Sequence, residues 1–136
     1  GFVLAAGIPP ASVGAALGSL SIMRREPERI ERLAANSRLF LELAKGAGLD
    51  TGPSHQSPIV PVITGSSTKA LQLSEGLYRA GINAQPILYP AVAEQQARIR
   101  FFITAAHHRE QIEFTVATLA QLWQDVGLGA EAVVSG

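Results

Sequence analysis

The stretch from residue 96 to residue 111 constrains the fold of this chain more than any other part of the sequence. Within it an apolar run, residues 97–103, carries two arginines and leads directly into a helical pattern. Because successive side chains of a strand point to opposite faces, Arg98 and Arg100 are expected to share one face. The apolar residues around them are expected on the other face: Ile99, Phe101 and Ile103. The pattern therefore predicts a strand with one buried side and one side that carries two cations.

These two guanidinium groups raise the question of which anion they meet. A guanidinium is always charged, and its planar fork of donors suits a carboxylate or a phosphate. Burying one without a partner is costly. The spacing alone favours the ordinary arrangements, in which such arginines lie at a sheet edge in water or form structural ion pairs. Arg98 and Arg100 are therefore candidate anion-binding residues, with these two arrangements as the alternatives.

Hydrophobic periodicity predicts interleaved helices and strands along the whole chain. Helices are expected over residues 11–25, 28–46, 68–79 and 108–126, and strands over residues 58–63, 82–88 and 97–103. The prolines of the first strand, Pro58 and Pro61, indicate an edge position or a strand end. This order predicts the α/β class, with helices packed on a small mixed three-strand sheet.

Length and composition limit what such a chain can be. Its 136 residues, 47% of them hydrophobic, suit a single globular domain with a real core. Residues 1–8 are interpreted as an apolar lead-in, and a frayed tail is expected over residues 127–136. A net charge of zero gives no reason to expect nucleic acid as a partner, and no apolar run reaches membrane-spanning length. The absence of cysteine excludes disulfides and is typical of a cytoplasmic protein.

The residues show little catalytic chemistry of their own. The sequence contains no Gly-x-Ser-x-Gly elbow, no P-loop and no dinucleotide-binding fingerprint. No metal site is predicted, because His107 and His108 are adjacent and point in divergent directions on a helix. Lys45 and Lys69 lie on predicted helices among polar neighbours, away from any desolvated pocket that would suit Schiff-base chemistry. The residues alone support only an α/β domain that grips an anion.

Six short motifs are spread along the whole chain. In order they are Gly7–Ala11, Ser57–Val62, Gly81–Asn83, Tyr89–Val92, Ala97–His107 and Glu110–Ile112. Together, in this order and spacing, they resemble the C-terminal small domain of the α-oxoamine synthases, which are pyridoxal-phosphate enzymes of fold type I. That family includes 8-amino-7-oxononanoate synthase, glycine C-acetyltransferase and serine palmitoyltransferase.

The resemblance implies a concrete activity for the parent enzyme. Members of the family use pyridoxal phosphate to condense an amino acid with an acyl thioester, and the cofactor is the electron sink. The second arginine of the family's Arg-x-Arg strand binds the amino-acid carboxylate, and it matches Arg100. Arg98 matches a variable position and is given a supporting role at most. His107 matches the family's small-small-His turn, where we expect it to orient the turn between strand and helix.

The chain also departs from the family pattern. Ala5 and Ala6 replace the usual hydroxyl residues that reach the cofactor phosphate of the neighbouring subunit, so no cofactor-binding residue is assigned. Leu88 stands where members that bind an acid-bearing acyl group often have an arginine. The family's cofactor lysine, its aspartate and its stacking aromatic residue belong to a large domain that these residues do not contain.

Two interpretations of function follow. In the first, this chain is the small-domain part of a homodimeric acyltransferase whose partners are the large cofactor domain, an amino acid and an acyl thioester. The 136 residues alone are then expected to be inactive and to bind no cofactor. In the second, the chain is a non-catalytic α/β binding or dimerisation module, with Arg98 and Arg100 in structural ion pairs.

Overall fold

The computed structural model describes the backbone of residues 7–134 and the side chains of residues 7–126. The chain forms two compact units, residues 1–32 and residues 33–136, and each is described by itself. Ala5, Ala6 and most of the expected apolar lead-in lie outside the described residues, as do residues 135 and 136 of the expected tail. The expectations for these positions stay predictions.

The first unit contains helix α1, Pro10–Arg25. Proline suits the first position of a helix, because its missing N–H has no helical partner there and its φ angle is already set. The helix ends at Arg25, and the N–H of the next residue, Glu26, donates to the carbonyl oxygen of Ile22 over 2.8 Å. None of the residues of α1 is buried, and Leu17 is 63% exposed.

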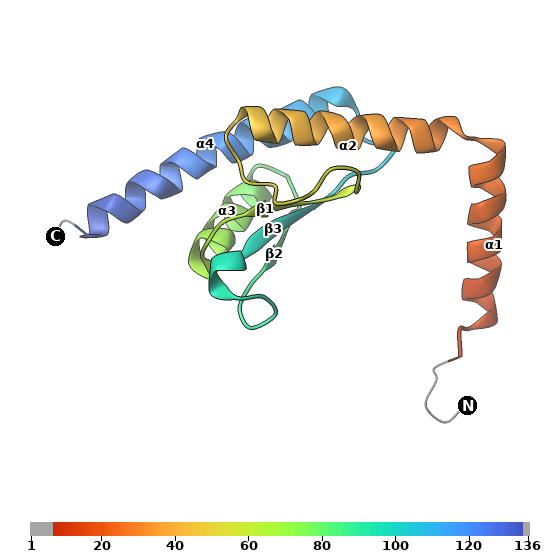
Figure 1. The fold of residues 1–136 in the computed structure, drawn as a ribbon, viewed down its shortest axis with the longest axis horizontal. Helices are drawn as coiled ribbons and strands as arrows, with labels where there is room; N and C mark the ends of the chain where they lie inside the picture. Colours follow the sequence, from red (N-terminus) through yellow and green to blue (C-terminus); the bar gives the residue numbers. More distant parts are fainter. Residues whose placement is uncertain (1–6, 135–136) are drawn as a thin grey trace. The chain divides into compact units, whose positions relative to one another are not determined.

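The second unit is built on a three-stranded sheet in the order β1-β3-β2 (Figure 1). Its strands are β1 (Ile59–Ile63), β2 (Gln85–Ile87) and β3 (Arg98–Phe102). Both neighbouring pairs are antiparallel, so the prediction of a mixed sheet is wrong in this respect. The reason is the place of β3. The strands β1 and β2 run in the same direction, but β3 pairs between them and leaves no adjacent parallel pair.

Prolines occupy outward-facing positions on both outer strands. The N–H of Ile63 donates to the carbonyl oxygen of Asp50 over 2.8 Å, so alternate N–H groups of β1, starting from Ile63, point away from β3. Pro61 occupies one of these outward positions, where its missing N–H costs the sheet no hydrogen bond. By the same alternation Pro86 faces outward on β2. The predicted edge position of the first strand is therefore confirmed.

One face of the sheet carries the core. Three helices of the chain contribute to it: α2 (Glu28–Gly46), α3 (Ser67–Arg79) and α4 (Arg109–Val134). The core cluster includes Phe40, Leu41, Val60, Val62, Leu73, Leu77, Ile99, Phe101, Ile112, Val116 and Leu119. Burying one such aliphatic or aromatic side chain contributes about 1.5–3 kcal/mol. The predicted fold class, helices packed on a small three-strand sheet, is confirmed.

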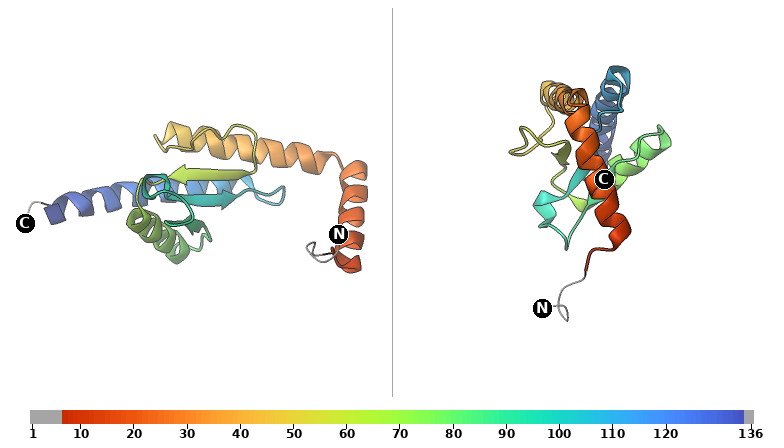
Figure 2. Two further views of the ribbon diagram at one scale, coloured as in Figure 1. Left: turned by 60° about the horizontal axis from the view of Figure 1, so that its bottom comes forward. Right: turned by 90° about the vertical axis from the view of Figure 1, so that its right-hand side faces the viewer.

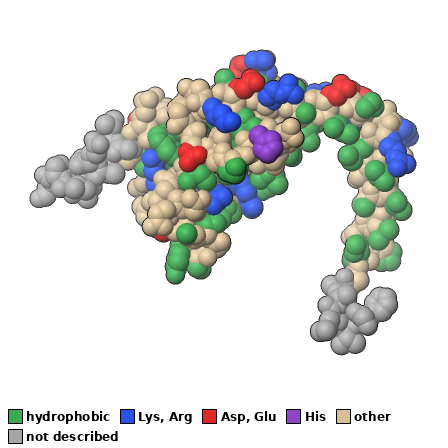
Figure 3. Space-filling view, viewed as in Figure 1, with side chains coloured by type: hydrophobic (Ala, Val, Ile, Leu, Met, Phe, Trp, Pro, Cys, Tyr) green, Lys and Arg blue, Asp and Glu red, His purple; other side chains and the backbone are tan. Residues whose placement is uncertain are grey.

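Hydrophobic periodicity predicts an inward stripe on α2 of Ile30, Leu33, Ala34, Leu41 and Ala44, and of these Leu41 and Ala44 are buried. Ile30, placed on the inward stripe by periodicity, is 46% exposed, whereas Phe40 is 1% exposed. The buried residues of α2 all lie in its second half: Ser37, Phe40, Leu41 and Ala44. Ser37 is tolerated there because its hydroxyl donates to the carbonyl oxygen of Leu33 over 2.8 Å. Charged side chains gather along the outer side of this helix (Figure 3).

Helix α4 runs past the end of the sheet (Figures 1 and 2). The sequence pattern predicts that it ends at Val126, but the helix extends to Val134, so the predicted tail begins as helix. Within the described residues, no helix combines the length and the apolar character needed to cross a membrane.

Candidate anion-binding site

The face of the sheet opposite the core carries both arginines of β3. Arg98 and Arg100 are half-buried, while Ile99 and Phe101 between and beside them are buried on the core side, so the predicted alternation is confirmed. We call this second side the arginine face. Its residues, given by the strand register, are Ile59, Pro61, Ile63, Gln85, Ile87, Arg98, Arg100 and Phe102. The arginine face is therefore largely apolar around two cations.

The two arginines differ in how their donors are satisfied. Arg98 Nε donates to the backbone carbonyl oxygen of Gln96 over 2.8 Å. Arg98 Nη2 donates to the side-chain oxygen of Gln96 over 3.4 Å. Arg100 Nε is buried and has no hydrogen-bond partner among the described residues. None of the ion pairs among the described residues involves either arginine. Of the two arginines of β3, Arg100 is thus the one with a buried donor that lacks a partner among the described residues.

The guanidinium of Arg100 leans toward the end of β3. Its central carbon lies 5.2 Å from the centroid of the Phe102 ring, within the range of a cation–π contact. Phe102 is 47% exposed, so this ring borders the guanidinium without enclosing it. Directly across the neighbouring strands, Arg100 faces Pro61 on one side and Gln85 on the other. An apolar border of this kind strengthens the attraction between the guanidinium and any anion that reaches it.

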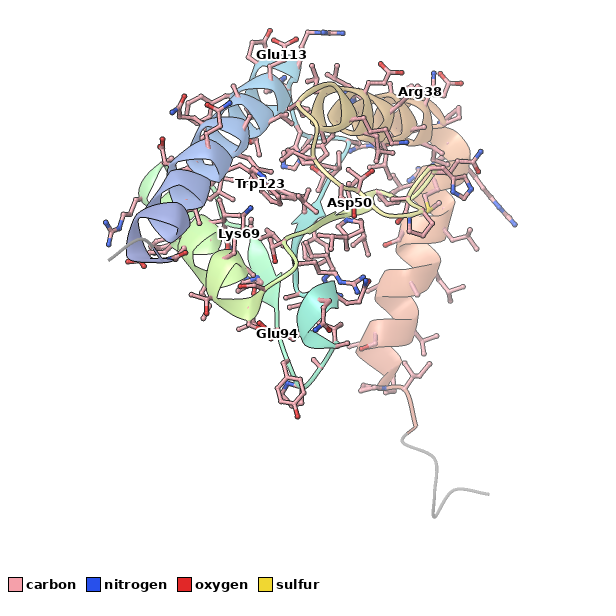
Figure 4. All side chains as sticks on the ribbon, turned by 60° about the vertical axis from the view of Figure 1, so that its left-hand side comes forward. Arg38, Asp50, Lys69, Glu94, Glu113 and Trp123 are labelled. Carbon is pink, nitrogen blue, oxygen red and sulfur yellow. The ribbon has the colours of Figure 1, made fainter. Side chains whose placement is uncertain are left out.

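The loop that leads into β3 is fastened to the start of α3. The carboxylate of Glu94 accepts hydrogen bonds from Ser67 N–H over 2.7 Å and from Ser67 Oγ over 2.5 Å. Tyr89 N–H, near the other end of the same loop, donates to Ser67 Oγ over 3.2 Å. The hydrogen bonds from Ser67 to the carboxylate lower the pKa of the Glu94 carboxyl. Figure 4 shows Glu94 beside the first turn of α3, where a carboxylate also meets the positive end of the helix dipole.

The turn after β3 is held by its own histidine and by helix α2. Thr104 N–H donates to Nδ1 of His107 over 3.2 Å. The side-chain amide of Asn36 in α2 donates to the carbonyl oxygens of Thr104 and His107, both over 2.9 Å. Gln111 accepts a hydrogen bond from His108 N–H over 2.9 Å and so caps α4. His107 also lines a pocket of about 350 Å³ with Phe101 and Phe102.

The expectation that Lys69 has polar neighbours is wrong. Its Nζ lies 3.7 Å from the centroid of the Trp123 ring, which α4 brings onto α3 (Figure 4). Partial burial lowers the pKa of Lys69. Local sequence could not show this, because Trp123 is far away in the chain. No cluster of potential metal ligands occurs among the residues that the structure describes.

Three residues near the site carry no signal in the sequence pattern. Gln85 faces Arg100 only because β2 pairs with β3, and Glu94 and Asn36 act through contacts across the fold. Each depends on strand pairing or helix packing, which no local motif encodes.

The structural neighbours of this chain are pyridoxal-phosphate enzymes of fold type I. A solved structure of SPT with pyridoxal phosphate (PLP) as an internal aldimine matches it with a TM-score of 0.80 and 25% sequence identity. The match covers 91% of this chain and 31% of that one.

The family model for aminotransferase class I and II matches residues 1–119, and the chain belongs to this family. An 8-amino-7-oxononanoate synthase of Symbiobacterium thermophilum is 42% identical over 93% of this chain and 32% of the relative. An 8-amino-7-oxononanoate synthase/2-amino-3-ketobutyrate coenzyme A ligase of Thermus thermophilus is 38% identical over the same shares. The chain thus spans about a third of the length of these relatives, and its predicted resemblance to the α-oxoamine synthases is confirmed.

Proposed function

We propose that this chain is the small-domain part of a PLP-dependent acyltransferase in which Arg100 binds the carboxylate of an amino acid. The observation that carries the proposal is the unpartnered, buried Nε of Arg100 on an otherwise largely apolar face. A carboxylate supplies the acceptors that this guanidinium lacks. The relatives named 8-amino-7-oxononanoate synthase and 2-amino-3-ketobutyrate coenzyme A ligase, and the SPT structure with PLP, support the reaction class.

In this account Arg100 positions the substrate and performs no chemistry on it. A bidentate contact to the carboxylate fixes the orientation of the amino acid, and so determines which bond of its α-carbon is presented for reaction. Phe102 limits the positions open to the guanidinium, because the ring borders it at 5.2 Å. Arg98, whose Nε donates to Gln96, is assigned at most a supporting role.

The described residues do not by themselves fit PLP. Lys69 is covered by Trp123, Lys45 is exposed at the end of α2, and neither lysine lines a described pocket. We therefore assign the cofactor, which supplies the electron sink when bound, to a large domain of the same enzyme. The complete enzyme is proposed to be a homodimer that takes an amino acid and an acyl thioester, and the 136 residues alone are proposed to be inactive.

The alternative, a non-catalytic module with Arg98 and Arg100 in structural ion pairs, has less support. The described part of the chain gives neither arginine a carboxylate within ion-pair distance.

The proposal is tested by expressing the complete open reading frame that contains this sequence. With glycine, L-alanine and L-serine as test amino acids and acetyl- and palmitoyl-coenzyme A as test thioesters, we expect PLP-dependent release of free thiol with at least one pair. An open reading frame without a lysine-bearing cofactor domain would overturn the proposal. So would a stable yellow adduct of PLP on Lys69 of the 136-residue chain.

A further inference from the structure

We infer that Gln85 is a second substrate-recognition residue, whose side-chain amide contacts the molecule that Arg100 holds by its carboxylate. This inference rests on the proposed function of Arg100 and extends it to a residue on the neighbouring strand. Nothing in the motifs of the sequence indicates such a role for Gln85.

The strand register places Gln85 next to the cation. Gln85 and Arg100 are direct partners in the antiparallel pair of β2 and β3. Directly opposite residues of such a pair project from the same face, with Cβ atoms about 4.5–5.5 Å apart. The lean of Arg100 toward Phe102 directs its guanidinium away from Arg98 and toward the end of β2 at which Gln85 lies, past the last residue pair of β2 and β3.

The surroundings make Gln85 the natural second polar contact. Arg98, the other polar residue on the arginine face, donates its Nε to the carbonyl oxygen of Gln96. The remaining residues of this face around Arg100 are apolar: Ile59, Pro61, Ile63, Ile87 and Phe102. Gln85 is exposed, and among the described residues its amide makes one hydrogen bond, donated by Nε2 to Oδ1 of Asn83 over 3.3 Å. A primary amide offers two N–H donors and an oxygen acceptor, so most of this capacity is free for a ligand.

Two substitutions of Gln85 test this geometry. In Gln85→Glu the new carboxylate lies directly across from Arg100, at a distance where opposite charges of a strand pair attract. It would occupy the guanidinium and repel a substrate carboxylate. In Gln85→Leu the guanidinium of Arg100 stays free to bind the substrate carboxylate, but the contact from the Gln85 amide is lost. The matched control is Gln72→Glu, which adds the same charge at an exposed position of α3.

The kinetic measurement is the KM for the amino acid in the complete enzyme, compared with Arg100→Ala. We expect Gln85→Glu to raise KM at least about tenfold, as loss of a charge-assisted contact does, and Gln85→Leu to raise it about three- to tenfold. Gln72→Glu should leave KM unchanged. If Arg100→Ala raises KM while both Gln85 variants behave like the control, the role of Gln85 is wrong and the proposed function stands. If Arg100→Ala leaves KM unchanged, the proposed function fails, and this inference fails with it.

A second measurement needs no activity. In the 136-residue chain labelled with ¹⁵N, the Nε–H signal of Arg100 reports directly on a new partner. We expect Gln85→Glu to shift this signal at neutral pH and to lose the shift when acid protonates the new carboxylate. An unshifted signal in a folded Gln85→Glu chain would show that Gln85 does not reach the guanidinium, and would overturn the inference.

Discussion

Lys69 and Trp123 form a cation–π contact between α3 and α4, with the Lys69 Nζ 3.7 Å from the centroid of the indole ring. This contact joins the helix whose first turn holds Glu94 to the helix that follows the arginine strand. It is a tertiary contact that only the folded chain makes. Its contribution can be measured separately from the function of the site.

A double-mutant cycle of Lys69→Met and Trp123→Leu is predicted to show a coupling free energy of about 0.5–2 kcal/mol, the range of partly desolvated cation–π contacts. The measurement is urea unfolding followed by circular dichroism, since the second variant removes the sole tryptophan. Lys45→Met, at an exposed position of α2, is the matched control and should show no coupling to Trp123. Additive effects of Lys69→Met and Trp123→Leu would contradict a direct contact.

The hydrogen bonds of Glu94 to Ser67 predict a loss of stability in acid. The pKa of Glu94 is lowered in the folded chain from its ordinary value of 4.5. The stabilisation is therefore fully present above that value and is lost as pH falls through the lower, folded pKa. Thermal unfolding followed from about pH 7 to about pH 3 should show a smaller decrease in Tm for Glu94→Gln than for the wild type. Glu42→Gln, on the exposed side of α2, serves as control. Parallel pH profiles for wild type and Glu94→Gln would count against this anchoring role.

Asn36 is predicted to hold the turn after β3 through its two amide N–H groups. Asn36→Ala leaves the carbonyl oxygens of Thr104 and His107 without these donors, and we expect a loss of about 1–3 kcal/mol. Asn36→Asp, which has nearly the same shape, should cost at least as much because a carboxylate cannot donate. The free energy of unfolding in urea gives both values. Asn83→Ala, at an exposed loop position, should change it by less than about 0.5 kcal/mol. A stable Asn36→Asp variant would contradict this role.

Local patterns predict much of this fold and part of its site. The limits of α2 agree with the sequence prediction, and the alternation of Arg98, Ile99 and Arg100 places the arginines on one face as expected. In both cases the signal lies within one element. Hydrophobic period and helix-ending glycine suffice for the helix, and period 2 suffices for the strand.

The errors arise where distant segments meet. The prediction of a mixed sheet is wrong because β3 pairs between β1 and β2, and no local pattern shows strand order. The surroundings of Lys69 and the position of Gln85 escape prediction for the same reason. On α2, periodicity identifies an apolar stripe, but only packing on the sheet determines that Phe40 is buried and Ile30 is not.

The central claim is that Arg100, and not Arg98, anchors the carboxylate of the substrate. The most direct test compares Arg100→Ala with Arg98→Ala in the complete enzyme by steady-state kinetics over a range of amino-acid concentrations. Arg100→Ala is predicted to raise KM strongly and to reduce kcat/KM by about 2–4 kcal/mol in transition-state free energy. Arg98→Ala is predicted to reduce kcat/KM by less than about tenfold, which corresponds to about 1.4 kcal/mol in transition-state free energy. Equal losses in the two variants, or unchanged kinetics in Arg100→Ala, would contradict the account.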